Sequence, residues 1–410
     1  MKDATFAPTF ARYDYIIIGG GTSGCALAAT LSQNATVLVL ERGGSPYENP
    51  TATDIQNFAT TLSNTSPKSW SQLFVSEDGV YNTRARVLGG GSVLNAGFYT
   101  RAGDDYVKEA EWKRDEVEAA YEWVENKIAF EPPVMGWQTA LKDGLLEAGE
   151  FPYNGFTYNH TYGTKIGGTI FDNVGQRHTA ANLLEYANPD TVAVYLHATV
   201  HKILFTTKGR PRPKAYGVIF QDENGVLHKA ELAKNAMNEV ILSAGAIGSP
   251  QLLMLSGYDN PSVRFNYYQE PEDLKKCVEG ITTIIKVINS KAFSKFKYPE
   301  ATIPGLLDLI LNVPTNLRPR HVTSVFNLKQ FCIDTVMTIW HYHGGCQIGR
   351  VVDKNYKVLG IDGLRVIDGS TFLKSPGTNP QATVMMLGRY MGQKILKERE
   401  AFFKKKEEEA

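Results

Sequence analysis

Two histidines and a cysteine lie close together near the C-terminal end of the chain, in the segment TIWHYHGGCQIG over residues 338–349. His341 and His343 are separated by one residue, and Cys346 follows three residues later. Such imidazoles can bind a metal, transfer a proton near neutral pH, or pack in the interior of a domain. The segment alone leaves all three roles open, so the choice depends on the rest of the chain.

A metal site is the weakest of these interpretations. Cys346 and Asp353 could add ligands to the two histidines, but their spacing matches no recognisable metal-binding pattern. The four cysteines are Cys25, Cys277, Cys332 and Cys346, and they contain no C-x-x-C pair of the kind that binds structural zinc. We therefore predict that the chain holds no metal.

The overall composition excludes several classes of function. The chain has 410 residues, 43% of them apolar, with 43 basic and 43 acidic side chains. The balanced charge and the lack of a basic stripe argue against a nucleic-acid partner. No apolar run approaches the roughly 18–20 residues that span a bilayer. Residues 1–15 contain no apolar signal core, so the sequence as given predicts no targeting segment.

Residues 13–42 have the pattern of a dinucleotide-binding unit. The apolar runs 15–18 and 37–40 predict two buried parallel strands, and the Ala- and Leu-rich stretch 23–31 predicts a helix between them. A glycine-rich turn joins the first strand to the helix, and Glu41 ends the second strand. Strand, turn, helix and terminal acid together indicate a nucleotide cofactor.

Each glycine of the pattern Gly19-x-Gly21-x-x-Gly24 has a separate steric role. Gly19 allows the tight turn, Gly21 lets the backbone approach a pyrophosphate, and Gly24 lets the helix pack on the strand. The helix N-terminus offers free N–H groups to the phosphates. Glu41 can accept hydrogen bonds from the ribose and would repel a 2′-phosphate, which disfavours NADP but leaves NAD and FAD open.

Two further glycine-rich segments follow along the chain. The first indicates either backbone that passes close to a ligand or a loop that needs positive φ. RARVLGGGSVLNAGFYTR, residues 84–101, contains three consecutive glycines. EVILSAGAIGSPQLLMLSG, residues 239–257, predicts a strand over 239–242, then a turn, then a helix with Ser249 as N-cap and Pro250 as its first residue.

The C-terminal block favours FAD over NAD. GLRVIDGSTF, residues 363–372, predicts a strand that ends at Asp368. Asn379 and Pro380 predict the start of a helix over residues 381–396. The positive pole of this helix would stabilise the negative charge that reduced flavin carries around N1 and the C2 carbonyl.

These segments resemble the glucose–methanol–choline (GMC) oxidoreductase family, and within it the plant branch of HOTHEAD-like and mandelonitrile lyase-like proteins. The resemblance covers about residues 10–398. It implies an α/β fold, in which a Rossmann-like FAD-binding domain of GMC type carries a truncated α+β substrate domain. The implied FAD-binding domain comprises residues 1–100, 190–258 and 335–410. The implied remnant of the substrate domain comprises residues 101–189 and 259–334.

The resemblance also implies which residues meet FAD. Binding is expected to be non-covalent, because no histidine lies near RVLGGGS to form the histidyl link found in part of the family. Around the pyrophosphate, ADP ribose and adenine, the matching positions are Gly19, Gly21, Thr22, Ser23, Gly24, Glu41, Arg42 and Val200. Around the flavin they are Val87, Ser92, Asn95, Ala96, Gly97, Phe98, Trp340, His341, Asp368, Gly369, Pro380 and Gln381.

The family's active site contains a histidine paired with a second histidine or an asparagine, and these positions match His341 and Asn379. In family oxidoreductases the histidine takes the alcohol proton while hydride passes to flavin N5. An asparagine cannot titrate, but it can orient the hydroxyl. Ile339 and His343 are expected to contact a small-molecule alcohol or cyanohydrin. The alternatives are that the histidines are interior residues and that Asn379 only caps its helix.

Three functions follow from the resemblance. The first is an FAD-dependent oxidoreductase that acts on CH–OH groups and converts an alcohol to an aldehyde. The second is a hydroxynitrile (mandelonitrile) lyase with structural FAD, and the third is a catalytically impaired isoform. Related lyases have a tyrosine where this chain has Ile339 and a histidine where it has Asn379. Both differences favour the oxidoreductase.

The chain departs from the family pattern after residue 257. It continues with residues 258–261 and then runs directly into SVRFNYYQEPEDLKKC, so that roughly a hundred or more residues of the substrate domain are missing, comparable to a small domain. Residues 262–268, with alternating Val263, Phe265 and Tyr267, are predicted to form a strand left without partners.

In the related lyases, the positions of Cys277 and Cys332 form a disulfide. The resemblance therefore implies this bond, an oxidising compartment and a secreted protein. The glycosylation sequons at Asn34, Asn64 and Asn159 agree with this. The chain is predicted to be a monomer.

Overall fold

The molecule is built around a six-stranded sheet, shown in a computed structural model that describes residues 1–255 and 262–409. All neighbouring strands in this sheet are parallel. In spatial order they are β1 (Lys2–Asp3), β11 (Val192–Leu196), β4 (Val37–Leu40), β3 (Tyr15–Ile18), β15 (Glu239–Leu242) and β16 (Leu364–Val366). Strands β3, β4 and β15 are buried at every position, because other layers cover both faces of the sheet.

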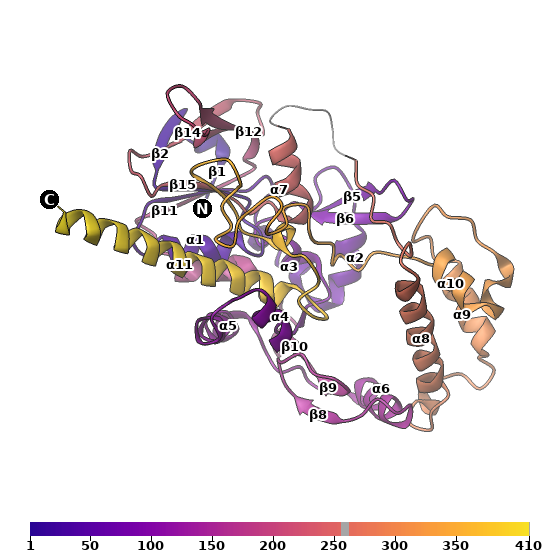
Figure 1. Cartoon of the computed structure of the whole chain (residues 1–410). Coiled ribbons are helices and arrows are strands. Elements are labelled where there is room, and N and C mark those ends of the chain that lie inside the picture. Colours follow the sequence, from indigo (N-terminus) through magenta and orange to yellow (C-terminus); the bar gives the residue numbers. More distant parts are fainter. Residues whose placement is uncertain (256–261, 410) are drawn as a thin grey trace.

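Two hydrophobic cores lie on opposite faces of this sheet. On one face, Ile17 packs with residues of α1 (Gly24–Leu31) and α11 (Gln381–Glu408), and α5 (Arg114–Ile128) packs against α11. On the other face, Ile16 and Ile18 pack against a second sheet. Its strands, in order, are β12 (Thr199–Thr206), β13 (Lys214–Gln221), β14 (Leu227–Leu232) and β2 (Phe10–Tyr13). Successive side chains of β3 therefore point to opposite faces of the sheet and contact the layer on each side. Figure 1 shows the three layers one above the other.

The remaining elements lie mainly beside this layered body. The other strands are β5 (Ser71–Val75), β6 (Tyr81–Ala85), β7 (Phe98–Tyr99), β8 (Tyr153–Phe156), β9 (Thr164–Ile166) and β10 (Gly168–Thr169). The other helices are α2 (Phe58–Ser63), α3 (Gly91–Leu94), α4 (Asp104–Glu109), α6 (Gly136–Glu147), α7 (Gly245–Met254), α8 (Pro271–Ile288), α9 (Ile303–Leu311) and α10 (Leu328–Asp334). No helix among the described residues is both long and apolar enough to cross a bilayer.

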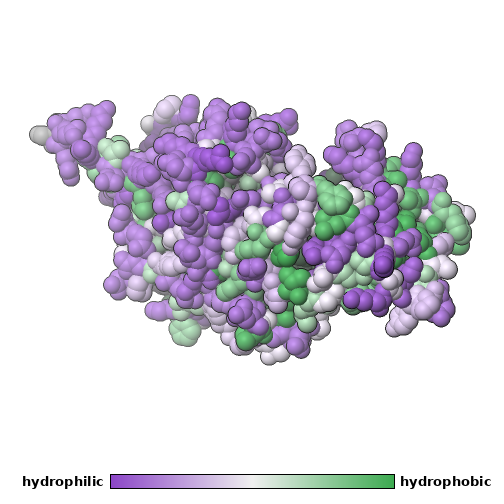
Figure 2. Space-filling model, turned by 90° about the horizontal axis from the view of Figure 1, so that it is seen from below, coloured by the Kyte–Doolittle hydropathy of each residue, from purple (hydrophilic) through white to green (hydrophobic). Residues whose placement is uncertain are grey.

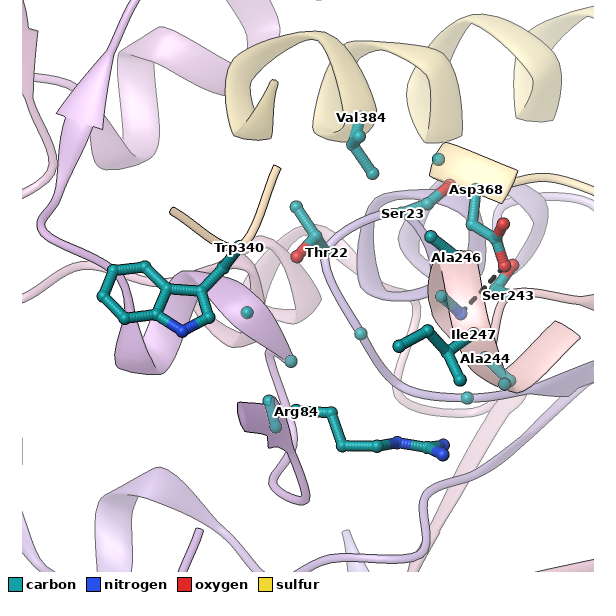
Figure 3. Close-up of a pocket in the computed structure, with 18 of the residues that line it drawn as sticks. Thr22, Ser23, Arg84, Ser243, Ala244, Ala246, Ile247, Trp340, Asp368 and Val384 are labelled. Carbon is teal, nitrogen blue, oxygen red and sulfur yellow. Dashed lines mark hydrogen bonds between the residues drawn. The ribbon is translucent and has the colours of Figure 1, made fainter. Parts of the chain in front are cut away.

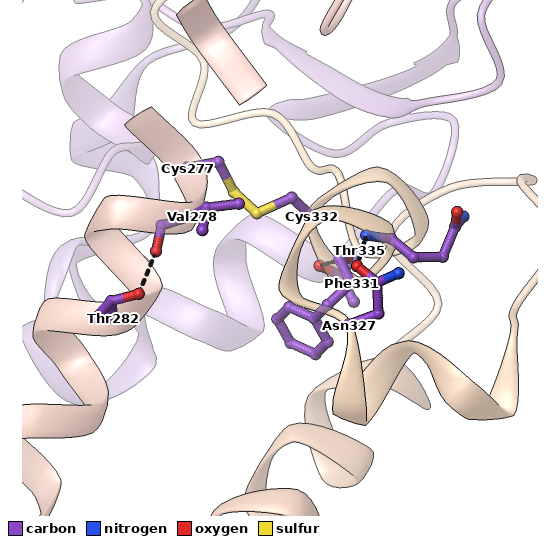
Figure 4. Close-up of a disulfide and its surroundings, with 8 residues drawn as sticks. Cys277, Val278, Thr282, Asn327, Phe331, Cys332 and Thr335 are labelled. Atoms are coloured by element: carbon purple, nitrogen blue, oxygen red, sulfur yellow. Dashed lines mark hydrogen bonds between the residues drawn. A yellow bond between two sulfur atoms is a disulfide. The ribbon is translucent and has the colours of Figure 1, made fainter. Parts of the chain in front are cut away.

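Helices α6, α8, α9 and α10 form an arm that extends away from the sheet (Figure 1). The predicted disulfide is confirmed: Cys277 of α8 bonds Cys332 of α10 (Figure 4). The arm has only a small core, around Leu307, Leu311 and Phe331. Figure 2 shows hydrophobic residues exposed at the centre and right of the molecule, whereas hydrophilic residues dominate over α11 at the left. Exposed apolar side chains of the arm and its loops include Ile284, Leu309, Ile310, Val313, Leu317, Val322 and Phe326.

Residues 262–268 do not form the predicted strand. The segment is irregular, and the carbonyl of Val263 accepts a hydrogen bond from the backbone of Glu77, 2.8 Å away. The ring of Phe265 stacks on Tyr342, with the ring centroids 5.5 Å apart. The alternating apolar side chains are therefore accommodated by aromatic packing instead of sheet pairing.

One predicted helix start and one predicted capping role also need correction. Helix α7 begins at Gly245, earlier than predicted, because the Ser249 hydroxyl bonds Asp368 instead of capping a helix. Helix α11 begins at Gln381, as expected, but its first residues receive no capping bond from Asn379. It extends to Glu408 and so includes the charged tail that follows residue 396.

Candidate cofactor and active site

A cavity of about 520 Å³ opens at the carboxyl ends of β3, β4 and β15, within the size range of cofactor sites. Ligands bind at this edge of open parallel sheets because the loops there diverge. Every predicted site residue except Gly24 and Ser92 lines the cavity. The structure therefore gathers residues that lie up to 362 positions apart, from Gly19 to Gln381.

Two glycine-rich turns meet at the floor of the cavity. At Gly19, where φ is +101°, an added Cβ would lie 2.5 Å from the carbonyl oxygen of Ser243. At Gly90 an added Cβ would lie 2.8 Å from the Cα of Gly21. Only glycine permits this approach, which leaves backbone facing the cavity where a pyrophosphate would bind. Gly24 lies behind the turn, and a Cβ there would be 2.0 Å from the Gly19 carbonyl oxygen, which accounts for its packing role.

The hydroxyl of Ser23 also fits a phosphate ligand. Its Oγ atom is buried and has no hydrogen-bond partner within residues 1–255 and 262–409. Figure 3 shows Ser23 and Thr22 on the turn that leads into α1. A buried polar atom without a partner is costly, and a phosphate oxygen at this position would satisfy it.

Glu41 is held firmly at the end of β4. Its Oε2 atom accepts a hydrogen bond from the Gly20 N–H at 3.0 Å, and its Oε1 atom accepts one from the Gly43 N–H at 2.9 Å. Burial raises the pKa of this carboxyl. Beside it, Arg42 donates to the side-chain oxygen of Gln72 at 2.6 Å. These residues form the wall predicted to meet the ADP ribose.

Asp368 organises the opposite wall, where β16 meets the N-terminus of α7 (Figure 3). Its Oδ2 atom accepts hydrogen bonds from the Gly245 N–H at 2.9 Å and from the Ser249 hydroxyl at 2.6 Å. Its Oδ1 atom accepts one from the Ser370 N–H at 2.8 Å. Burial raises the pKa of Asp368. The carboxyl therefore fixes the turn before α7 against the strand end.

Asn95 and Gln381 form a hydrogen-bonded wall at the predicted flavin position. Asn95 Nδ2 donates to Gln381 Oε1 at 2.8 Å, and Gln381 Nε2 donates to the carbonyl of Phe98 at 2.5 Å. Ser92 lies outside the cavity lining. Its hydroxyl donates to the carbonyl of Gly89 at 2.7 Å, so it supports this wall from behind.

The predicted catalytic pair is assembled in the cavity. His341 Nε2 and Asn379 Nδ2 lie 3.3 Å apart, although 38 positions separate the two residues. Trp340, the preceding residue, has a φ of +60°, which costs a non-glycine residue about 1–3 kcal/mol. His343 is exposed and donates from Nδ1 to the His341 carbonyl at 3.0 Å. Ile339 is 63% exposed and lies with His343 at the cavity mouth.

The pKa of His341 is lowered, first by burial and then by the nearby His343. Its imidazole is therefore neutral at neutral pH, and Nε2 has a lone pair available. Cys346 is fully buried among the residues packed between the two sheets. Across the described ranges, no group of three or more His, Cys, Asp or Glu side chains is arranged to hold a metal ion.

Several lining residues were not predicted from the sequence. They include Arg84 of β6 and, around the start of α7, Ser243, Ala244, Ala246 and Ile247 (Figure 3). The glycine-rich turn of SAGAIG marks the second group, because backbone there must approach a ligand as closely as at Gly19. Nothing in the local sequence distinguishes Arg84 from Arg86, two residues later, which does not line the cavity.

The chain matches two sequence profiles, both described as GMC oxidoreductase. One covers residues 13–272 and the other covers residues 251–388. The two matches overlap at residues 251–272, which include the position where the predicted deletion lies.

Curated plant proteins are similar over almost the whole chain. HOTHEAD of Arabidopsis thaliana is 43% identical, and the alignment covers 94% of this chain and 88% of HOTHEAD. The (R)-mandelonitrile lyase-like protein of Arabidopsis thaliana is 38% identical, with 97% and 92% covered. Sinalpyl alcohol oxidase Nec3 of Nesocodon mauritianus is 37% identical, with 95% and 89% covered. The HOTHEAD alignment runs over 526 positions although it uses 94% of the 410 residues of this chain, so it contains gaps within this chain, which agrees with an internal loss.

A solved structure shows the same fold. The crystal structure of formate oxidase superposes with a TM-score of 0.77 at 15% identity, covering 96% of this chain and all of the oxidase chain. The GMC oxidoreductase family match identifies FAD as the cofactor, and the glycine-lined cradle leaves room for its pyrophosphate. The chain belongs to the FAD-dependent GMC oxidoreductase family.

Proposed function

We propose that this chain oxidises an alcohol to an aldehyde, with His341 as the proton acceptor. The observation that carries the proposal is the 3.3 Å contact between His341 Nε2 and Asn379 Nδ2 in the cavity wall. The Asn379 amide is a donor, so this contact requires a lone pair on Nε2. Because the pKa of His341 is lowered, its imidazole is neutral at neutral pH and Nε2 has this lone pair.

His341 and Asn379 have complementary roles in this proposal. An alcohol hydroxyl that reaches Nε2 can pass its proton to the imidazole, and the Asn379 amide can hold the alcohol oxygen in line. FAD, when bound, accepts the hydride that leaves the carbinol carbon. The loss of one proton and one hydride converts the C–O single bond to the carbonyl of the product.

The substrate enters past Ile339 and His343 in this account. Both residues lie at the cavity mouth, and Ile339 presents an apolar side chain there. An apolar entrance favours a carbinol that carries an apolar or aromatic substituent. We further propose that FAD is held non-covalently and spans the strand ends supplied by residues 1–100, 190–258 and 335–410.

Two substitutions argue against the lyase alternative. The lyase interpretation calls for a tyrosine at the position of Ile339 and a histidine at the position of Asn379. One relative named as an alcohol oxidase is nearly as similar to the chain as the lyase-like relative, so overall similarity does not decide between them. The chemistry at these two positions supports alcohol oxidation.

We also propose that the chain resides in an oxidising compartment outside the cytosol. The Cys277–Cys332 disulfide supports this, because such bonds persist where thiols are not kept reduced.

The visible spectrum and two substrates test the proposal. The purified chain should carry oxidised flavin, and benzyl alcohol added without oxygen should bleach its absorbance while benzaldehyde forms. Benzaldehyde released from mandelonitrile with an unbleached flavin would instead support the lyase. A colourless preparation that does not take up added FAD would contradict both functions.

A further inference from the structure

Arg177 is a buried cation that packs against aromatic rings. It lies between β10 and the short helix η5 (Ala180–Tyr186), and only 7% of its surface is exposed. Its guanidinium carbon lies 4.3 Å from the ring centroid of Phe171 and 5.9 Å from that of Phe58. Within the part of the chain that the structure describes, no ion pair joins Arg177 to a carboxylate.

The guanidinium lies directly behind the wall of the FAD cavity. Its Nη1 atom donates to Asn95 Oδ1 at 3.1 Å and to the Ser92 carbonyl at 3.2 Å. Asn95 lines the cavity and donates in turn to Gln381, which also lines it. One side chain therefore separates this positive charge from the cavity.

An unpaired charge at this depth is energetically costly. Burial removes the hydration of a guanidinium, and contacts with aromatic faces restore only part of it. Burial lowers the pKa of Arg177 to about 9, which still leaves it charged at neutral pH. Arg365 shows the opposite arrangement: it is fully buried and bonds both Glu239 and Glu398 at 2.6 Å. Arg389 also lacks a carboxylate partner among the described residues, but only Arg177 contacts a residue that lines the cavity, so its charge acts on a site where a bound ligand can bring a negative charge.

We propose that Arg177 stabilises the two-electron-reduced state of bound FAD, as a positioning residue that acts through Asn95. The inference rests on the proposed function, because hydride transfer from an alcohol adds two electrons and leaves the flavin with an extra negative charge. A cation in a poorly hydrated interior favours that charge over the neutral oxidised form. An acidic partner for Arg177 would cancel the effect.

The flavin reduction potential tests this inference without any substrate. The potential is measured on the FAD-loaded protein by equilibration with a redox dye. Arg177→Met should weaken the preference for the reduced state at least tenfold, which is about 30 mV for a two-electron couple. Arg177→Lys retains the charge and should restore most of this difference.

Arg389 provides a matched control. Among residues 1–255 and 262–409 it also lacks a carboxylate partner; its guanidinium carbon lies 4.6 Å from the Trp123 ring centroid, and Nη1 donates to the Thr30 hydroxyl at 3.3 Å. Neither partner lines the cavity, so Arg389→Met should leave the potential unchanged.

Three outcomes would overturn the inference. They are an Arg177→Met protein with the potential of the parent, an Arg177→Lys shift as large as that of Arg177→Met, and an equal shift in Arg389→Met. If Arg177→Met does not fold, the neutral variant Arg177→Gln can be compared with the charged variant Arg177→Lys instead. A parent chain that binds no FAD would contradict the proposed function itself. That result is distinct from the three outcomes above, in all of which the parent protein holds FAD.

Discussion

At the scale of residues, the chemistry depends on one imidazole whose surroundings keep it neutral. His341 is partly buried, and the neighbouring His343 adds electrostatic repulsion to the cost of burial. Both effects disfavour the imidazolium form and so lower the pKa. Asn379 cannot titrate, so a single proton acceptor should control the pH dependence of the reaction.

This arrangement predicts the pH profile of flavin reduction by an alcohol. The rate should be full at neutral pH and should fall as pH drops through the His341 pKa, below the ordinary value of 6.5. His343→Ala removes the repulsion, so the falling limb should move to higher pH. Stopped-flow absorbance without oxygen measures both profiles. If the rate of the parent already fell above pH 7, or if the fall moved to lower pH in His343→Ala, His341 would not be the proton acceptor.

At the scale of elements, the cofactor cradle depends on turns that no side chain can enter. An added Cβ at Gly24 would lie 2.0 Å from the Gly19 carbonyl oxygen, where α1 meets β3. The clash involves backbone, so a rotamer change cannot relieve it. A side chain at position 24 should therefore disrupt both the cofactor cradle and the packing of α1 on the sheet.

Gly24→Ala should lose bound FAD and destabilise the fold by at least about 2 kcal/mol, as overpacking of a tight contact does. Gly280→Ala is the matched control, because Gly280 lies within α8 and an added Cβ there has no neighbour within 4 Å. The ratio of flavin to protein absorbance and the thermal midpoint report both effects. Full flavin content in Gly24→Ala would refute the close-packing account.

The disulfide gives a second prediction about the elements. Protein purified without reductant and then denatured should show two free thiols, from Cys25 and Cys346. The other two cysteines join α8 to α10 and should react only after reduction. A count of four without reductant would mean that the bond does not form in the protein as isolated.

The sequence predicted the central elements well, because β3, β4 and β15 are short continuous apolar runs that only a doubly covered sheet accommodates. It failed at residues 262–268, where alternation suggested a strand although no sheet edge receives it. The start of α7 was also misplaced, because the Ser249 hydroxyl, a good cap in isolation, bonds an aspartate 119 positions away. Arg177 carried no signal, since its burial arises entirely from tertiary packing.

At the scale of the whole molecule, the deletion affects two parts unequally. The layered body carries the FAD cavity, whereas the arm of α6, α8, α9 and α10 has only a small core and exposes many apolar side chains. No residue of α8 or α10 lines the cavity. The loss of more than a hundred aligned positions should therefore weaken the arm more than the cofactor site.

Reduction of the Cys277–Cys332 bond should affect the arm and leave the layered body unchanged. A reductant should increase the binding of a hydrophobic dye, because α8 and α10 become free to move apart. FAD should stay bound, since its cradle lies in the body. Fluorescence of the dye and of released flavin, followed together, distinguishes the two. Release of flavin in step with dye binding would show that the arm supports the cofactor site.

The account's central claim is that His341 accepts the substrate proton while bound FAD is reduced. The most direct test compares the parent with His341→Ala in a single turnover with benzyl alcohol in the absence of oxygen, followed at the flavin absorbance. The account predicts that both proteins hold oxidised FAD, that the parent is bleached, and that the variant is bleached about 10²–10⁴-fold more slowly. Bleaching of His341→Ala at the parental rate would contradict it.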